Sequence, residues 1–431
     1  MNGDDGVRDL AQLRRRLNRS PRVARLTQLS KQLRKTSAVR ETIQRKVGFE
    51  FEAIAGWHVY GRNRDKGKWE EIKHTKQLLL MGPNGLGGLS SDNGKAEWVS
   101  RPLTTWDEVA LAHVDFQELL SRIASSGTLK LAGEEQAFAS TQSQYAQHKF
   151  TGARDGVRTK AQATLGVAAG SIPDLFEKLI ALASSSPKRR DKLAEAAKGV
   201  ANREVTFGMP EALAGGPAVI SKSSARSGLT PDGNTAREAA GFVMILLKTI
   251  TDARHRPAAD EDPKYAFPMM PRTDFGSMLA SLENTTQGVL GTLWADGNLG
   301  PEIAAAIGCP LDVPLFVRGY RQLDKTHTPG PTIQEWLASV FEGGGRKDLL
   351  SPPPGFPRHV YDDQTKQPEG LGAMGPDPDN QKLLLFELRQ VTEQEICTNE
   401  DWLAIMAAFA KTTGIVTGDR ALIPPESSRK R

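Results

Sequence analysis

Cysteine is scarce in this sequence: Cys309 and Cys397 are the only two in 431 residues. Two thiols are too few for a disulfide framework, and neither has the CxxC or Cys/His neighbours of a structural zinc site. The sequence also lacks an apolar run of about 18 residues, the length that spans a membrane. Its N-terminus lacks the apolar segment of a secretory signal peptide. We therefore expect a cytoplasmic protein in a reducing environment.

A large excess of one charge is absent over the whole chain, because the formal net charge is only +5. This balance does not imply a nucleic-acid footprint, so we expect no nucleic-acid partner. Hydrophobic residues make up 39% of the sequence, which is enough for a sizeable core and excludes global disorder.

The charge that is present is unevenly distributed. Residues 1–46 contain 13 Lys and Arg but only 4 Asp and Glu, so this segment carries +9 and the remainder about −4. Such an asymmetry is typical of a tail that binds an acidic surface or a loading machine. Leucines at roughly helical spacing, from Leu10 to Leu33, predict a basic amphipathic helix. A solvated N-terminal extension is the alternative.

The rest of the chain reads as one α+β domain, residues 47–423, followed by a short basic tail, residues 424–431. Runs rich in Gly, Ser, Pro or Gln predict loop-rich insertions within it. These insertions are 124–158, 205–235 and 324–380. Apolar periodicity and capping residues predict helices at Trp106–Ile123, Ser171–Ser184, Lys188–Ala201, Thr235–Ala253, Asp274–Leu282, Thr332–Phe341 and Thr398–Thr412.

The stretch Lys46–Glu52 alternates apolar and acidic residues with the two-residue period of a strand. Phe49 and Phe51 then face a core, while Glu50 and Glu52 lie side by side on the other face. Like charges this close repel each other unless a positive charge lies between them. The alternative interpretation is a half-exposed edge strand with solvated glutamates.

A second acidic pair follows a glycine-rich loop, Met81–Gly88. The loop lacks the Gly-Lys-Ser/Thr ending of a P-loop, so we do not assign it to phosphate binding. Asp92 begins an Asp-Asn-Gly turn, and Glu97 lies on a short predicted strand, Ala96–Val99. Glu97 at the rim of the fold and Asp92 as a turn-shaping residue are the alternatives.

Two later strands carry polar pairs. Gln162 and Thr164 share a face of the strand Thr159–Ala168, where a hydrogen-bonding core role for Gln162 is the alternative. Glu387 and Arg389 share a face of the terminal strand, where they alternatively form an ion pair across strands.

In this order, the four stretches resemble the carboxylate–amine ligase superfamily that includes glutamine synthetase and glutamate–cysteine ligase, and its amidoligase branch in particular. The matching residues are Gly48, Glu50, Glu52, Asp92, Glu97, Val99, Ser100, Pro102, Gln162, Glu387 and Arg389. The sequence departs from the family at Thr164, where members often have a metal-binding histidine. A hydroxyl is a poorer ligand, which puts one metal position in doubt.

The resemblance implies a curved, mainly antiparallel sheet with an acidic concave face and helices on its outer side. It also implies ATP and Mg²⁺ (or Mn²⁺) as cofactors and amide formation through an acyl-phosphate. The implied metal ligands are Glu50, Glu52, Asp92, Glu97 and Glu387. The implied catalytic residues are Glu50, Glu387 and Arg389, and the implied nucleotide-binding residues are Gln162, Lys264, Arg272 and Arg389. Lys264 and Arg272 are alternatively surface charges.

The basic leader, the Ile43–Arg45 boundary and the segment Pro271–Phe275 resemble cargo proteins of extracellular contractile injection systems. This second resemblance implies an effector or toxin that a loading partner recognises through residues 1–46 and that acts in the cytosol of a target cell. The substrates would be a carboxylate and an amine, including those of a protein. Two rival functions remain at this stage: a metal-dependent phosphoryl hydrolase, and a non-catalytic binding or cargo protein that retains the fold.

Overall fold

The computed structural model describes residues 46–72, 74–154, 156–185, 192–201, 203–255, 269–271, 275–315, 320–321, 327–328, 332–342, 383–388 and 396–413. The basic arm up to residue 45, the basic tail and most of the 324–380 insertion lie outside these ranges.

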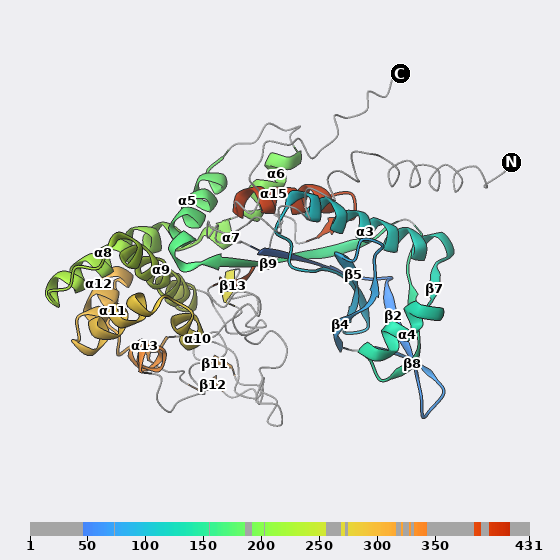
Figure 1. The fold of residues 1–431 in the computed structure, drawn as a ribbon, viewed down its shortest axis with the longest axis horizontal. Coiled ribbons are helices and arrows are strands. Elements are labelled where there is room, and N and C mark those ends of the chain that lie inside the picture. Colours follow the sequence, from blue (N-terminus) through green and yellow to red (C-terminus); the bar gives the residue numbers. More distant parts are fainter. Residues whose placement is uncertain are drawn as a thin grey trace, which may run out of the picture. The chain divides into compact units, whose positions relative to one another are not determined.

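A mainly antiparallel sheet of twelve strands organises the described chain, with α-helices packed against it (Figure 1). The strand order is β10-β13-β9-β1-β6-β2-β8-β7; β14 also pairs with β9, β3 with β2, and β5 with both β4 and β6. The strands are β1 (Lys46–Ala53), β2 (His58–Asn63), β3 (Trp69–Glu71), β4 (His74–Met81), β5 (Gly87–Asp92), β6 (Lys95–Ser100), β7 (Thr128–Lys130), β8 (Tyr145–Thr151), β9 (Arg158–Ala168), β10 (Met269–Pro271), β13 (Leu383–Leu388) and β14 (Cys397–Thr398). The predicted α+β class is confirmed, although the sheet is not strongly curled.

The helices account for most of the remaining described residues. They are α3 (Trp106–Ser126), α4 (Gly133–Gln142), α5 (Ile172–Ala183), α6 (Lys192–Val200), α7 (Arg203–Thr206), α8 (Met209–Arg226), α9 (Gly233–His255), α10 (Phe275–Ala280), α11 (Asn284–Ala295), α12 (Leu299–Ile307), α13 (Ile333–Phe341) and α15 (Trp402–Thr413), with a short 3-10 helix at Ala169–Ser171 and a separate two-stranded ribbon of β11 (Tyr320–Arg321) and β12 (His327–Thr328). None of these helices is both long enough and apolar enough to cross a membrane.

Strand β1 has the two faces that its alternation predicts. Phe49 and Phe51 are fully buried, whereas Glu50 and Glu52 are half-buried on the opposite face. On the apolar face, the ring of Phe51 stacks on Trp402 of α15 at a centroid distance of 4.8 Å and meets Phe116 of α3 edge-on at 5.8 Å. Helices α3 and α15 therefore cover the apolar side of the central strands, as Figure 1 shows.

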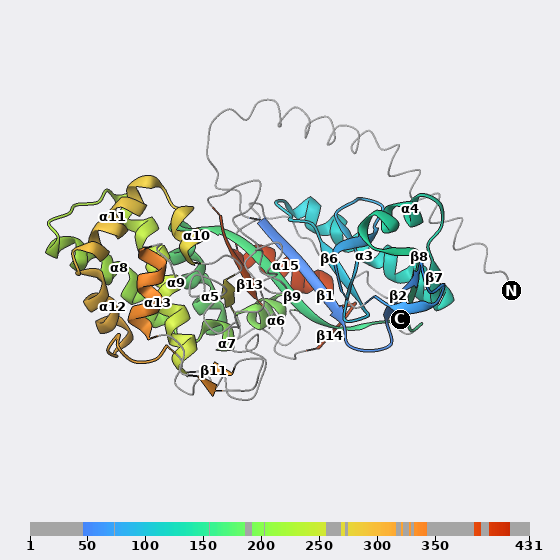
Figure 2. The same ribbon diagram turned by 90° about the horizontal axis from the view of Figure 1, so that it is seen from below.

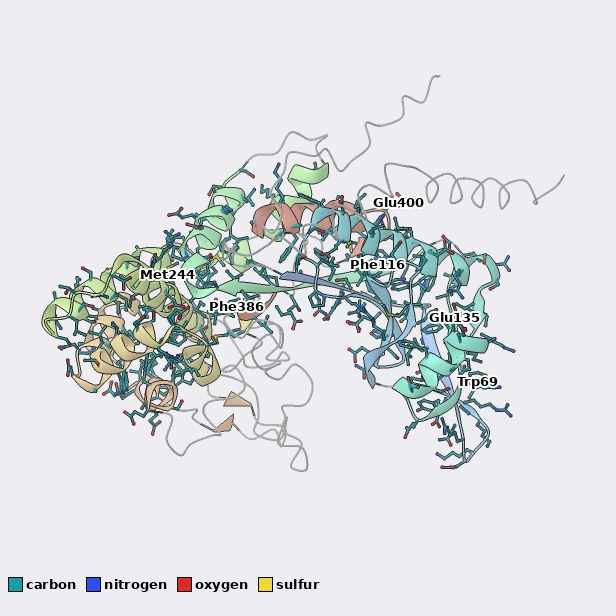
Figure 3. The ribbon with its side chains drawn as sticks, in the orientation of Figure 1. Trp69, Phe116, Glu135, Met244, Phe386 and Glu400 are labelled. Carbon is teal, nitrogen blue, oxygen red and sulfur yellow. The ribbon has the colours of Figure 1, made fainter. Side chains whose placement is uncertain are left out.

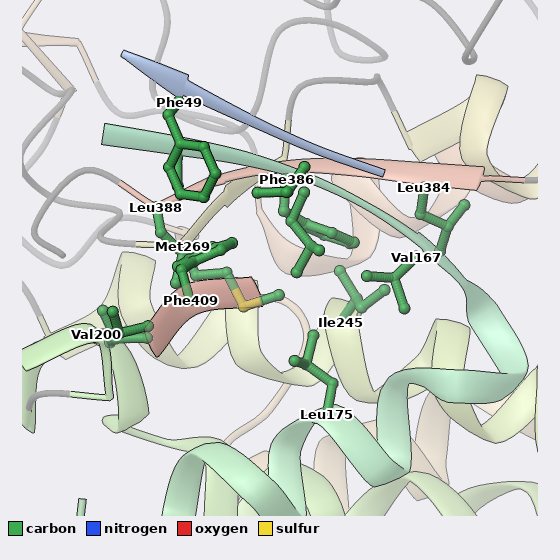
Figure 4. Packing of buried hydrophobic residues seen from close by; sticks show 14 of the residues in the cluster. Phe49, Val167, Leu175, Val200, Ile245, Met269, Leu384, Phe386, Leu388 and Phe409 are labelled. Atoms are coloured by element: carbon green, nitrogen blue, oxygen red, sulfur yellow. The ribbon is translucent and has the colours of Figure 1, made fainter. Parts of the chain in front are cut away.

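The apolar face continues onto β9 and β13. Phe386 and Leu384 of β13 are buried together with Leu175 of α5 and Ile245 of α9, as the close view in Figure 4 shows. Aliphatic and aromatic side chains fill this layer, so burial of apolar area holds the helical region against the sheet.

The predicted loop at 205–235 is wrong, because α8 occupies Met209–Arg226. Small residues in this stretch serve helix packing. A Cβ atom at Gly216 would lie 2.3 Å from Cγ of Met244 and 2.8 Å from the carbonyl oxygen of Ala240. Glycine thus lets α8 approach α9 closely in the helical region, where Figure 3 labels Met244.

The predicted loop at 124–158 is also wrong: it contains the end of α3, then β7, α4 and β8. One of its polar side chains, that of Gln136, forms hydrogen bonds with the backbone of β8. Oε1 of Gln136 accepts a hydrogen bond from the backbone N–H of His148 at 2.9 Å, and Nε2 of Gln136 donates to the carbonyl of Ala146 at 3.0 Å. Polar composition therefore concealed an ordered helix and strand.

Candidate functional site

Strands β13, β9, β1 and β6 are neighbours in this order, so the sheet brings together the four stretches that the sequence singled out (Figure 2). Glu387 of β13 is directly opposite Thr164 of β9, which is opposite Gly48 of β1. Two residues further along β9, Gln162 is opposite Glu50. Directly opposed residues of antiparallel strands point to the same face of the sheet, so these residues share one face.

The same face continues across β6 and β5. Glu52 is opposite Glu97, and Glu97 is opposite Ser90, while Asp92 is opposite Lys95 at the end of the β5–β6 hairpin. Opposed Cβ atoms lie about 5 Å apart, so neighbouring carboxylates on this face are within reach of one another. We call this side of the sheet the acidic face and define it by Glu50, Glu52, Asp92, Glu97 and Glu387.

Two of the carboxylates have identified partners. The hydroxyl of Ser90 donates a hydrogen bond to Oε2 of Glu97 at 2.8 Å. The ammonium of Lys95 lies 3.8 Å from Oε1 of Glu52, and both side chains are partly exposed. Glu52 and Glu97 are directly opposite each other, but each interacts with a different side chain: Glu52 with Lys95, and Glu97 with Ser90.

The pKa of Glu97 is raised by the other carboxylates of the acidic face. Its pKa rises to about 8, because burial disfavours the charged form and because the nearby charges of Glu50, Asp92 and Glu52 add to that effect. The hydrogen bond from Ser90 opposes the rise without cancelling it. Four of the five predicted carboxylates therefore share one electrostatic site.

Glu387 lies at the buried end of the acidic face, with a relative exposure of 1%. Its strand is two strand spacings from β1, about 10 Å across an ideal sheet. Thr164 of β9 lies between Glu387 and Gly48 of β1. Gly48 has no side chain, and a Cβ atom built there would lie 3.9 Å from Cβ of Thr164, so there is space at this point of the face. Glu387 is thus on the predicted face, but further from Glu97 than the other acids.

The donor chemistry of the acidic face suits a hard divalent cation. All five acids offer oxygen ligands, and a cation there would remove the repulsion that raises the pKa of Glu97. Among the described residues, no group of three or more His, Cys, Asp or Glu side chains has the arrangement that holds a metal ion. The residue types therefore fit Mg²⁺, while the side chains would have to move to coordinate it.

Three residues expected at the site fall outside the described ranges. These are Lys264, Arg272 and Arg389. Their predicted nucleotide-binding and catalytic roles stay predictions, as does the alternative ion pair between Glu387 and Arg389.

The glycine-rich loop is folded around a carboxylate of the protein itself. Asp115 of α3 is fully buried, and its Oδ1 accepts hydrogen bonds from the backbone and side-chain nitrogens of Asn84 at 2.7 and 2.9 Å. Its Oδ2 accepts from the backbone N–H groups of Leu86 and Gly87 at 2.8 and 2.9 Å. These amides are therefore committed to a carboxylate of the protein itself.

A Ser-His pair formed by half-buried Ser143, between α4 and β8, and buried His148 of β8 also has a structural explanation. Nε2 of His148 lies 2.5 Å from the hydroxyl of Ser143, and Nδ1 lies 3.1 Å from Nε2 of Gln136. The backbone contacts of Gln136 fix its amide nitrogen toward Nδ1, so the imidazole proton belongs on Nε2. His148 then donates to Ser143 and has no lone pair there to act as its base.

No protein-family model matches this chain, and neither a curated protein nor a solved structure was found that resembles it. The likeness to carboxylate–amine ligases therefore depends on the matching residues and on their placement in the sheet.

Sequence reasoning missed two side chains of the acidic face, Lys95 and Ser90. A signal for Lys95 was present, because it precedes Glu97 by two residues and so shares its face of β6. Ser90 becomes a neighbour of Glu97 only through the β5–β6 hairpin, whose register the sequence did not specify.

Proposed function

We propose that this protein is an ATP- and Mg²⁺-dependent carboxylate–amine ligase whose metal ions bind at the acidic face. The observation that carries the proposal is the convergence of Glu50, Glu52 and Asp92 on Glu97, whose pKa they help to raise. A cluster of like charges is costly to fold, and a divalent cation would offset that cost.

Within this proposal, Glu50, Glu97 and Asp92 hold divalent cations, and Glu387 contributes from the buried end. Bound Mg²⁺ would supply the positive charge that phosphoryl transfer from ATP to a carboxylate requires. The sheet positions these acids from several strands, so their relative placement does not depend on one loop. The proposal includes a fold related to the catalytic domain of glutamine synthetase, with a sheet that is less curled than the resemblance implies.

Metal binding is the first test, because it needs no knowledge of the substrates. Titration of the full chain with Mn²⁺, followed by electron paramagnetic resonance of the free ion, should show specific binding. Glu97→Gln and Glu50→Gln should weaken it at least about ten-fold. Glu118→Gln is the matched control, since Glu118 is exposed on α3. Equal affinity in all four proteins would overturn the proposed site.

The chemistry can be tested with a trapping amine. Hydroxylamine converts an acyl-phosphate into a hydroxamate, so the wild type with Mg²⁺, ATP and a pool of carboxylates should form hydroxamate together with ADP. Glu50→Gln combined with Glu387→Gln should abolish this product. If ATP-dependent ligation survives in the double variant, the assignment is wrong.

One observation favours a second function, a binding or cargo protein that has kept the fold without the activity. Thr164, directly opposite Glu387, stands where the related ligases often have a metal-binding histidine. The absence of Mn²⁺ and ATP binding in calorimetry would favour this function.

Phosphate release that needs no amine acceptor would instead favour a phosphoryl hydrolase. Whether the protein is a ligase or a hydrolase, the proposal includes its delivery as an effector into a target cell, with the basic arm, residues 1–46, as the segment that a loading partner recognises.

A further inference from the structure

Lys95 occupies a distinctive place at the open end of the acidic face. It lies on the same face of β6 as Glu97, two residues away, and its ammonium is 3.8 Å from Oε1 of Glu52. About a third of its side chain is exposed (36%), against 20% for Glu52. The ammonium is therefore held beside the acids while remaining accessible from solvent.

Two other lysines lie on this face. Lys160 of β9 is directly opposite Glu52 and is half-buried. Lys149 of β8 lies over the rings of Tyr60 and Trp69, at 4.8 and 4.7 Å from their centroids. Trp69 marks the distant end of the sheet in Figure 3. Lys95 combines an accessible positive charge with a contact to the acidic cluster, because its ammonium lies 3.8 Å from Oε1 of Glu52.

A lysine held by a glutamate next to divalent-cation ligands has a general use in phosphoryl chemistry. The carboxylate orients the ammonium, and the ammonium binds a phosphate oxygen that the metal ions leave uncovered. In the absence of nucleotide, the same ammonium lowers the negative potential at the acids and so competes with a free metal ion.

We propose that Lys95 contacts a phosphate group of the nucleotide and that Glu52 positions it, rather than serving as a metal ligand. The inference rests on the proposed function, because it requires a nucleotide–metal complex at the acidic face. It makes two predictions of opposite sign. Loss of the ammonium weakens binding of the Mn²⁺–ATP complex, and it strengthens binding of Mn²⁺ alone.

Calorimetry of the wild type, Lys95→Met and Lys149→Met separates this role from simple structural damage. We expect Lys95→Met to bind Mn²⁺–ATP about ten-fold more weakly, and Mn²⁺ alone about three-fold more tightly. Lys149→Met should match the wild type in both titrations. Lys95→Arg, which retains the charge, should recover part of the nucleotide affinity.

The outcomes distinguish the two proposals. If the wild type binds neither Mn²⁺ nor Mn²⁺–ATP, the proposed function fails and the role of Lys95 fails with it. If the wild type binds both and Lys95→Met behaves like Lys149→Met, the metal site stands and the role of Lys95 is refuted. Weakening of both ligands in Lys95→Met would equally refute it, since that pattern indicates a damaged site.

Discussion

Asp115 and Glu97 are two carboxylates on opposite sides of the same sheet, and their surroundings differ sharply. Asp115 extends from α3 on the apolar side and accepts four hydrogen bonds from nitrogen donors. Glu97, on the acidic face, accepts one identified hydrogen bond, from Ser90, and lies among three like charges. The charge of Asp115 is supported by donors of the protein, whereas burial and like charges disfavour that of Glu97.

This difference indicates which acid serves the fold and which is suited to a ligand. A buried carboxylate with a full set of donors stabilises the segments that supply them. A carboxylate whose pKa is raised by burial and like charges reduces stability whenever it ionises, and a bound cation can offset that loss. Asp115 is therefore structural, and Glu97 is the better candidate for function. Substitutions at the two positions should have effects of opposite sign.

The largest effect is expected from Asp115→Asn. In the variant, an NH₂ group takes the place of one carboxylate oxygen and faces the two N–H donors that this oxygen accepted from. The loop therefore loses two hydrogen bonds to a charged group. The free energy of unfolding should fall by about 4 kcal/mol. Urea unfolding followed by tryptophan fluorescence measures it. Asp107→Asn, at an exposed position in the same helix, should change stability by less than about 0.5 kcal/mol. A loss below about 1 kcal/mol at Asp115 would contradict its structural role.

His148 extends the comparison to a buried group that is satisfied only when neutral. Burial lowers its pKa from 6.5 to about 4, so the unfolded chain binds the proton more tightly between these values. Its contribution to stability is therefore intact above pH 6.5 and is lost as the pH falls toward 4. The loss should be about 3 kcal/mol.

Urea titrations of the wild type and His148→Gln at several pH values test this prediction. Because all other groups are shared, the difference between the two proteins isolates His148. The wild type should lose stability more steeply than the variant on acidification. Parallel curves would show that folding does not lower the pKa of His148 and would contradict the prediction.

Glu97→Gln should reverse the sign seen at Asp115. The folded-state pKa of Glu97, about 8, is above the ordinary value of 4.5, so the group reduces stability progressively as the pH rises through this range. At pH 9 with a chelator present, Glu97→Gln should be about 2 kcal/mol more stable than the wild type. Glu118→Gln should be neutral. Destabilisation by Glu97→Gln would mean that its carboxylate is supported as well as that of Asp115.

The sequence was sufficient where a local pattern determines the structure. The alternation in Lys46–Glu52 correctly predicted which side chains of β1 are buried, and capping residues located α3, which begins with a capping box at Thr105 and Glu108. It failed where small or polar residues have distant partners. Gly216 fits against α9, and Gln136 binds the backbone of β8, so glycine in α8 and polar residues in α4 were misinterpreted as loop signals.

The acidic face was predictable for a related reason. Glu50, Glu52, Glu97 and Glu387 lie on strands whose period fixes their face, and antiparallel pairing places the strands next to one another. Lys95 and Asp115 were not predicted, because their roles depend on strand register and on a contact between α3 and a distant loop. Neither is encoded in a local period.

Ser90→Ala gives the smallest expected effect and tests the comparison most directly, since it changes the number of donors and leaves both carboxylates in place. Loss of the 2.8 Å hydrogen bond removes the contact that lowers the pKa of Glu97, so that pKa should rise above its value of about 8. At pH 9, where Glu97 is ionised, Ser90→Ala should be about 1 kcal/mol less stable than the wild type. At pH 5, where the carboxyl is protonated, the difference should shrink.

Ser125→Ala, at an exposed site on α3, controls for loss of a hydroxyl. A pH-independent difference would show that Ser90 acts through packing alone, and the number of donors would then not explain why Glu97 and Asp115 differ.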